Sequence, residues 1–171
     1  MPRPKKVKTI VIHCTAGFGS IESIKRFWKN TLGWKSVGYH RVVDVDGKIH
    51  DLAGLSTITN GVRGYNSSSI HIAYIGGVDK DNVHKAEDTR TDKQKLMIDH
   101  CISTALLWLE KNGVNIDNIL VCGHRDFSTD QNKNGVIESW ERIKECPSFD
   151  ALHEHRHYSG INVRGKLPTN I

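Results

Sequence analysis

The chain has 171 residues and a formal net charge of +5, which suits one domain able to bury roughly 70% of its unfolded surface. Its composition is ordinary for a globular protein, and no apolar run approaches the roughly 20 residues of a membrane-spanning helix. The positive charge suits an anionic partner such as nucleic acid, a membrane surface or a bacterial wall polymer, or serves solubility alone. No Lys/Arg block with interleaved aromatic residues supports nucleic acid. We therefore expect a monomer that neither binds nucleic acid nor inserts into membranes.

The predicted elements alternate between strands and helices along the chain. Apolar residues at helical spacing predict a helix over 20–32, and alternating residues predict the strands. Asp46 and Gly47 predict a hairpin turn, and Thr91 with Gln94 predicts a capping box that starts a helix over 92–112. The predicted strands cover residues 7–14, 37–45, 48–52, 69–76 and 118–122. Strands mixed with helices, without repeats, predict a single α/β domain with a central mixed β-sheet flanked by helices.

The N-terminal residues 1–6 are basic, but the apolar stretch after them is too short and too polar for a signal-peptide core. We therefore expect synthesis in a cytoplasm, with no recognisable signal peptide. In that compartment reduced thiols are favoured over disulfides, and one or two of them can serve a metal. The four cysteines are Cys14, Cys101, Cys122 and Cys146.

Three residues far apart in the sequence form a candidate zinc site. His13 ends an apolar run, His124 follows another, and Cys146 lies in a later polar segment. Each supplies a nitrogen or sulfur donor that zinc favours, and the ends of neighbouring strands can bring such donors together. Three protein ligands leave a fourth position open for water, which is typical of a catalytic rather than a structural zinc. This pattern favours a hydrolase.

Other cysteines and histidines are weaker candidates. Cys122 shares the strand parity of His124, but Gly123 interrupts the strand and a ligand two residues away would crowd the metal, so Cys146 is preferred. Strand alternation points Cys14 to the opposite face from His13, into the core with Ile10 and Ile12. The remaining histidines are interpreted as packed or surface residues (His40, His50, His71, His84, His100) or as a solvated tail able to bind metal adventitiously (His153, His155, His157).

Five motifs occur in a fixed order along the chain: 11–16 (VIHCTA), 38–43 (GYHRVV), 62–66 (VRGYN), 123–126 (GHRD) and 144–150 (KECPSFD). With these motifs the chain resembles the type 2 N-acetylmuramoyl-L-alanine amidases, the zinc family that includes phage endolysins and is related to peptidoglycan recognition proteins. The resemblance implies a mixed sheet flanked by helices, with zinc in a surface groove. It also implies a basic arm over residues 1–6, a zinc amidase domain over 7–153 and a C-terminal tail over 154–171.

The resemblance further implies a function and its residues. The expected reaction is zinc-dependent hydrolysis of the amide between N-acetylmuramic acid and L-alanine in bacterial peptidoglycan, after release or secretion to the wall. His13, His124 and Cys146 match the zinc ligands, and Tyr39 and Lys144 match the two polar catalytic residues. A Lys ammonium can stabilise an oxyanion, and a Tyr hydroxyl can orient water or move a proton.

Two features qualify this resemblance. The first is that related non-catalytic proteins only bind peptidoglycan, and this alternative stays open, although such members typically lack the cysteine that is present here as Cys146. The second is Asn60-Gly61, which stands where relatives often carry a histidine that faces the substrate. Contacts between this loop and the substrate are therefore expected to differ from those of the relatives.

The segment between His124 and Cys146 contains a second pattern. Residues 130–141 satisfy the twelve-residue calcium-loop pattern, with oxygen side chains at positions 1, 3 and 5, glycine at 6 and glutamate at 12. A helix over 138–144 is expected to follow. The alternative is an Asn/Gly-rich surface turn. The candidate calcium ligands are Asp130, Asn132, Asn134, the Val136 carbonyl and Glu141.

Overall fold

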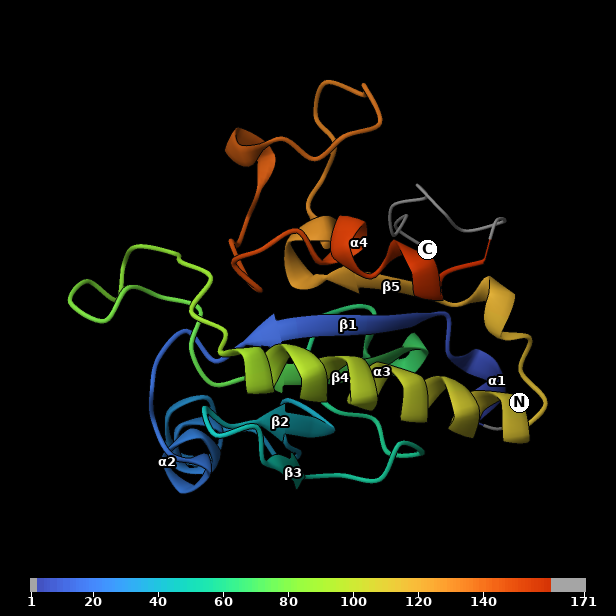
Figure 1. Cartoon of the computed structure of the whole chain (residues 1–171), viewed down its shortest axis with the longest axis horizontal. Coiled ribbons are helices and arrows are strands. Elements are labelled where there is room, and N and C mark those ends of the chain that lie inside the picture. The colour runs from blue at the N-terminus through green and yellow to red at the C-terminus, as the bar shows by residue number, and fades with distance from the viewer. Residues whose placement is uncertain (1–2, 161–171) are drawn as a thin grey trace.

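A computed structural model describes residues 3–160 of the chain. A five-stranded sheet runs through the centre, in the order β3-β2-β4-β1-β5 (Figure 1). β1 is parallel to β4 and β5, β2 is parallel to β4, and β3 is antiparallel to β2. The predicted mixed sheet in a single α/β domain is confirmed. The strands are β1 (Thr9–Cys14), β2 (Arg41–Val43), β3 (Ile49–Asp51), β4 (Ser69–Tyr74) and β5 (Leu120–Gly123).

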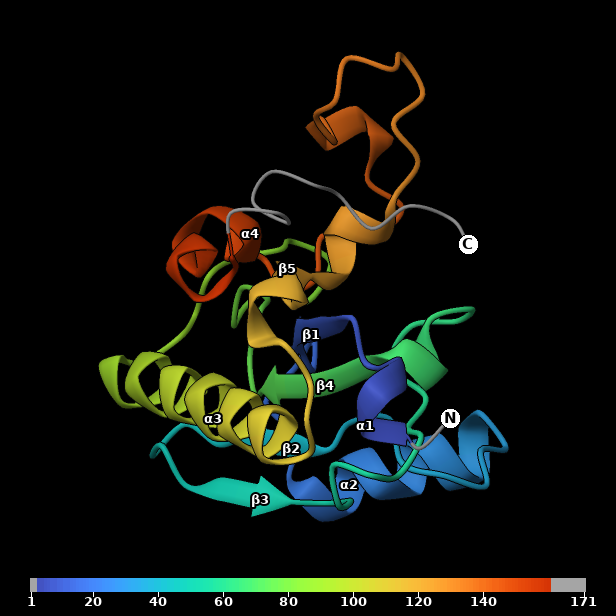
Figure 2. The same ribbon diagram turned by 90° about the vertical axis from the view of Figure 1, so that its right-hand side faces the viewer.

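The long helix α3 (Asp92–Lys111) covers one face of the sheet (Figure 2). It begins at the predicted capping box, in which Thr91 and Gln94 satisfy each other's backbone amides. One stripe of the helix packs against the even-numbered residues of β1 and β4, and each buried aliphatic side chain there contributes about 1.5–3 kcal/mol. The main contacts of this layer are Ile10, Ile12, Ile70, Ile72, Ile98, Ile102 and Leu109.

The opposite face of the sheet carries α2 and the loops that form the candidate site. α2 (Ile21–Arg26) starts at Ser20, whose side chain accepts a hydrogen bond from the Ser23 amide, and continues as a π-helical turn over Phe27–Thr31. Ile21 and Ile24 pack against Val42 of β2 and Ala73 of β4. The short helices α1 (Arg3–Lys6) and α4 (Ala151–Glu154) complete the described fold. Within residues 3–160, no helix combines the length and apolarity needed to cross a membrane.

The observed elements differ from the predicted ones in three places. β2 is shorter than the predicted strand over 37–45; at its N-terminal end the His40 carbonyl accepts from both the Leu52 and Ala53 amides, which interrupts the regular ladder. The helix expected over 138–144 is wrong, since only a 3-10 turn forms there, at Ser139–Glu141. His155 is buried rather than solvated. Of the expected arm and tail, residues 1–2 and 161–171 lie outside the described residues.

Candidate metal centre

His13 lies at the end of β1, where its side chain is fully buried. Its position on the strand points it away from α3, on the same face as Val11. Burial, reinforced by the charge of His124, lowers the pKa of His13 well below its usual value. His13 is therefore a neutral imidazole near pH 7, which is the form that coordinates a metal.

His124 directly follows β5 and starts a 3-10 turn over His124–Phe127. The carboxylate of Asp126 accepts a hydrogen bond of 2.7 Å from the Gly123 amide and so fixes this turn. The rings of His13 and His124 lie 4.9 Å apart between centroids. Burial, and then the charge of Lys144, lower the pKa of His124 to about 4, so this imidazole too is neutral near pH 7.

Residues 128–145 form an excursion that projects from the body of the domain (Figure 1). Cys146 directly follows this excursion and lies beside both histidines. Its Sγ is 3.8 Å from His13 Nδ1 and 3.2 Å from the Cys14 amide nitrogen, which donates to it. The Cys146 carbonyl accepts a hydrogen bond of 2.7 Å from the Arg125 amide. These bonds tie the cysteine to β1 and to the turn that carries His124.

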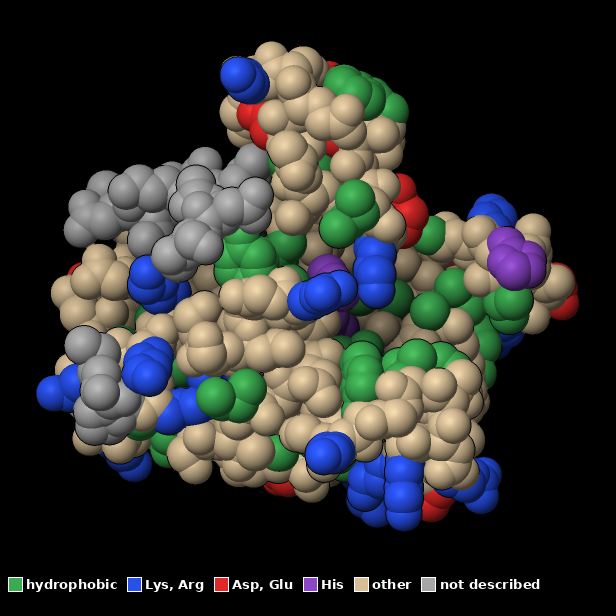
Figure 3. All heavy atoms as spheres, turned by 180° about the vertical axis from the view of Figure 1, so that it is seen from behind, with side chains coloured by type: hydrophobic (Ala, Val, Ile, Leu, Met, Phe, Trp, Pro, Cys, Tyr) green, Lys and Arg blue, Asp and Glu red, His purple; other side chains and the backbone are tan. Residues whose placement is uncertain are grey.

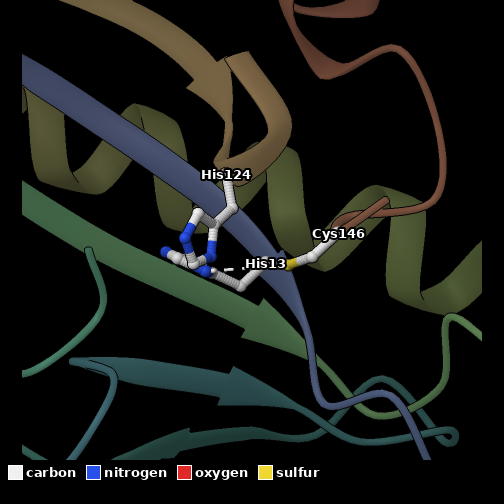
Figure 4. A group of neighbouring side chains, drawn as sticks. All are labelled: His13, His124 and Cys146. Atoms are coloured by element: carbon white, nitrogen blue, oxygen red, sulfur yellow. Dashed lines mark hydrogen bonds between the residues drawn. The ribbon is translucent and has the colours of Figure 1, made fainter. Parts of the chain in front are cut away.

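The three side chains point toward one another, as Figure 4 shows. One ligand atom from each of His13, His124 and Cys146 lies within 4.8 Å of the others. Two imidazole nitrogens and one thiol sulfur form a donor set that fits zinc, and three such ligands leave one coordination position open. Cys122, the weaker candidate, is instead buried among Val11, Leu120 and Val62. Cys14 packs in the core with Ile10 and Ile12, as predicted.

The convergent side chains lie at the bottom of a groove with two pockets. One pocket, of about 590 Å³, is lined by Tyr39, Trp28 and residues of α2. The other, of about 500 Å³, is lined by His124, Tyr65 and Phe127 among others. Trp34 and Lys144 line both pockets. In Figure 3 histidine side chains are visible at the floor of a hollow that Lys and Arg side chains border.

Tyr39 and Lys144 occupy different positions in this groove. The Tyr39 ring lies 4.9 Å from the His13 ring and 5.3 Å from Trp28. Trp28 can reach this place because Gly38 has no side chain. A Cβ at Gly38 would lie 2.8 Å from the Trp28 ring. Burial raises the pKa of Tyr39 well above its usual value, so the hydroxyl keeps its proton. Lys144 is exposed, and its charge contributes to lowering the pKa of both histidines.

Comparison with protein families matches residues 3–147 to the family described as N-acetylmuramoyl-L-alanine amidase. The chain belongs to this family. The endolysin of Klebsiella phage KP32 is 26% identical over 149 residues, covering 85% of this chain and 83% of the phage protein. The endolysin of Enterobacteria phage T3 is 29% identical over 147 residues, with 84% and 82% covered.

Solved structures agree on the fold. The Ph2119 endolysin from a Thermus scotoductus bacteriophage superposes with a TM-score of 0.63 at 19% identity, covering 90% of this chain and 85% of the endolysin. Drosophila PGRP-LB superposes with a TM-score of 0.63 at 18% identity, with 91% and 85% covered. The amidase fold therefore extends over nearly all of the described residues.

The structure of this amidase family member adds to the site His71, which the sequence alone led us to interpret as a packed or surface residue. His71 of β4 is fully buried, and its Nδ1 lies 3.1 Å from Nε2 of His13. The alternation of β4 puts His71 on the same face as Ala73, whose register partner is His13. That register could not be read from the sequence. Trp34, shared by both pockets, was also missed.

The structure does not support the calcium hypothesis for residues 130–141. The Asp130 carboxylate accepts hydrogen bonds from the Asn134 and Gly135 amides. The buried Glu141 carboxylate accepts from the Gln131, Asn132 and Glu138 amides. Asn132 and Asn134 likewise accept amide hydrogen bonds within the loop, and Val136 donates one of them. The loop is shaped by these internal bonds, which is what an Asn/Gly-rich turn requires.

Proposed function

We propose that this protein hydrolyses the amide bond between N-acetylmuramic acid and L-alanine in bacterial peptidoglycan, with zinc held by His13, His124 and Cys146. The observation that carries the proposal is the convergence of these three ligand atoms within 4.8 Å, at the floor of a groove in a chain that belongs to the amidase family. Relatives named as endolysins support a role on the wall after release from the cell.

Each polar residue of the groove has a chemical task in this proposal. Bound zinc would supply Lewis-acid chemistry to the scissile amide. Lys144, at the boundary of the two pockets, would stabilise the negative charge that develops on the carbonyl oxygen. Tyr39 keeps its proton because burial raises its pKa, so its hydroxyl would donate a hydrogen bond or a proton to the reacting groups.

A non-catalytic peptidoglycan-binding protein is the second candidate. Peptidoglycan recognition proteins are among the relatives, including SC2 of Drosophila melanogaster, which is 22% identical over 158 residues. The complete His-His-Cys ligand set argues for catalysis, because a module that only binds the wall needs no open metal site.

Digestion of purified cell walls followed by mass spectrometry tests the proposal. We expect stem peptides with new L-alanine amino termini, uncut glycan strands, and loss of activity on chelation. New reducing sugar ends without free alanine amines would overturn the proposed reaction, because glycan cleavage uses a different set of groups. Zinc content gives a second test: Cys146→Ser should lose most of the metal, since a hydroxyl is a poorer zinc ligand than a thiolate, whereas Cys122→Ser should keep it.

A further inference from the structure

His71 and Gly61 form a matched pair beside the candidate metal centre. A Cβ built on Gly61 would lie 2.3 Å from Cγ and 2.4 Å from Nδ1 of the His71 ring. Gly61 does not have a positive φ, so its backbone would accept alanine. The three atoms nearest to such a Cβ all belong to the imidazole of His71, which therefore requires glycine at this position. The ring fills the space into which a side chain at position 61 would project.

The backbone of His71 is held on both sides by His40. The His71 amide donates to His40 Nδ1 over 2.9 Å, and the His71 carbonyl accepts from the His40 amide over 2.9 Å. Because His40 Nδ1 is an acceptor, its proton is on Nε2, 2.9 Å from the Thr57 carbonyl that accepts it. The position of the His71 ring is thus determined by strand, loop and a neighbouring histidine.

The contact between His71 and His13 has two possible proton arrangements. If His71 Nδ1 donates, His13 Nε2 is the acceptor and the proton of neutral His13 is on Nδ1, the atom that faces Cys146 Sγ at 3.8 Å. If His13 Nε2 donates, His13 Nδ1 presents a lone pair toward Cys146 and can bind a metal. The second arrangement leaves a proton on His71 Nε2, a buried atom with no hydrogen-bond partner among the described residues. A buried unpaired group is costly and points to a functional reason for its retention.

We propose that His71 is a positioning residue for the metal centre: its Nδ1 accepts the Nε2 proton of His13, fixes the ring, and leaves His13 Nδ1 free to bind zinc, while Gly61 provides the space. Outer hydrogen-bond partners of metal-binding histidines commonly perform this task, usually as carboxylates or carbonyls. In this chain an imidazole on the neighbouring strand performs it. This inference rests on the proposed zinc site.

The test compares zinc affinities, measured by competition with a chromophoric chelator. His71→Leu removes the acceptor and should weaken zinc binding about 10–100-fold. His71→Asn can place its amide oxygen near the position of Nδ1, so it should restore the affinity to within a few-fold of the wild type. Unfolding of the zinc-free proteins in urea shows whether the two variants are equally stable. If they bind zinc equally well, the acceptor has no role and the inference is overturned.

A double-mutant cycle tests the pairing with Gly61. Gly61→Ala should displace the His71 ring and weaken zinc binding, whereas the same change in a His71→Ala background should have little further effect. Gly54→Ala is the control, because a Cβ there meets only Ser56 Oγ at 4.0 Å and the φ of Gly54 is not positive. Additive effects in the cycle would contradict the pairing.

Nitrogen NMR of the zinc-loaded wild type provides a readout that a purely structural role would not change. We expect the His13 proton on Nε2 and a scalar coupling across the hydrogen bond to His71 Nδ1. A proton on His13 Nδ1 would overturn the inference. A wild type that binds no zinc would overturn the proposed function as well, whereas a zinc-loaded, active wild type with His71→Leu unaffected would overturn this inference alone.

Discussion

Arg90 connects two distant parts of the chain next to the segment that carries Cys146, and its removal should destabilise the protein. Its guanidinium pairs with Asp88 at 2.8 Å and with Glu154 at 2.7 and 2.9 Å. It also lies 3.2 Å from the centroid of the buried Phe149 ring. Because only 2% of the Arg90 side chain is exposed, Arg90→Ala loses both ion pairs, the cation–π contact and the packing at once.

The magnitude of this loss follows from the exposure of the partners. Breaking a fully buried ion pair costs about 3–5 kcal/mol, but the side chains of Asp88 and Glu154 are 36% and 42% exposed and can be rehydrated. With a cation–π contact of about 1 kcal/mol, we expect a net loss of about 3 kcal/mol. For a domain of this size, that corresponds to a fall in melting temperature of about 6–12 °C.

Urea unfolding in the presence of a chelator measures this loss without a contribution from bound metal. Lys85→Ala is the control, because Lys85 pairs with Asp79 at the surface, where water screens the pair, and its removal should change the unfolding free energy little. The Arg90 hydrogen bond holds the pKa of Glu154 below its usual value. A lowered pKa stabilises the folded state above the usual carboxyl range, so the difference between wild type and Arg90→Ala should shrink as pH falls through it. A loss below about 1 kcal/mol at pH 7 would refute the reasoning.

Three further predictions concern the groove and the excursion. Tyr39→Phe and Lys144→Ala should keep zinc and the fold but lose turnover by about 10²-fold or more; near-normal rates in zinc-loaded samples would contradict their roles. Asp126→Ala should lower the unfolding free energy by about 1–3 kcal/mol, because it leaves the Gly123 amide unpaired, whereas Asp126→Asn keeps an acceptor and should cost less in the same urea assay. Glu141→Ala should destabilise by about 1–3 kcal/mol without calcium; a calcium-dependent rise in melting temperature seen only in the wild type would instead restore the calcium hypothesis.

Local signals in the sequence were sufficient for most of the fold. The capping box at Thr91 fixed the start of α3, and strand alternation placed Cys14 in the core, opposite to His13. These predictions succeeded because each depends on residues close together in the chain. The strand predicted over 37–45 failed at its N-terminal end because the bonds of the His40 carbonyl depend on the residues that follow β3, which no local pattern encodes.

The candidate site shows the same division between local and long-range information. His13, His124 and Cys146 could be predicted as a candidate ligand set from residue types and strand ends, and the structure brings them together. The role of His71 could not, because it depends on the register between β1 and β4 and on the missing side chain at Gly61. A glycine in a loop and a histidine in a strand are each common in sequences. Only the folded structure shows that the His71 ring occupies the space beside Gly61.

The excursion over residues 128–145 separates His124 from Cys146 by a long segment, yet the two side chains meet at the candidate metal centre. In Figures 1 and 2 the segment projects away from the body of the domain. Its base is closed, since the Arg125 amide donates to the Cys146 carbonyl at 2.7 Å and the Ile143 amide donates to Ser128 Oγ at 3.1 Å. The entropic cost of bringing the ends of a flexible loop together grows only slowly with loop length. A long excursion therefore destabilises the fold little more than a short one. The hydrogen bonds at the base of the excursion therefore help to hold the two candidate ligands in place, and we expect changes in its outer part, with the internally bonded turn over 130–141, to leave their positions unchanged.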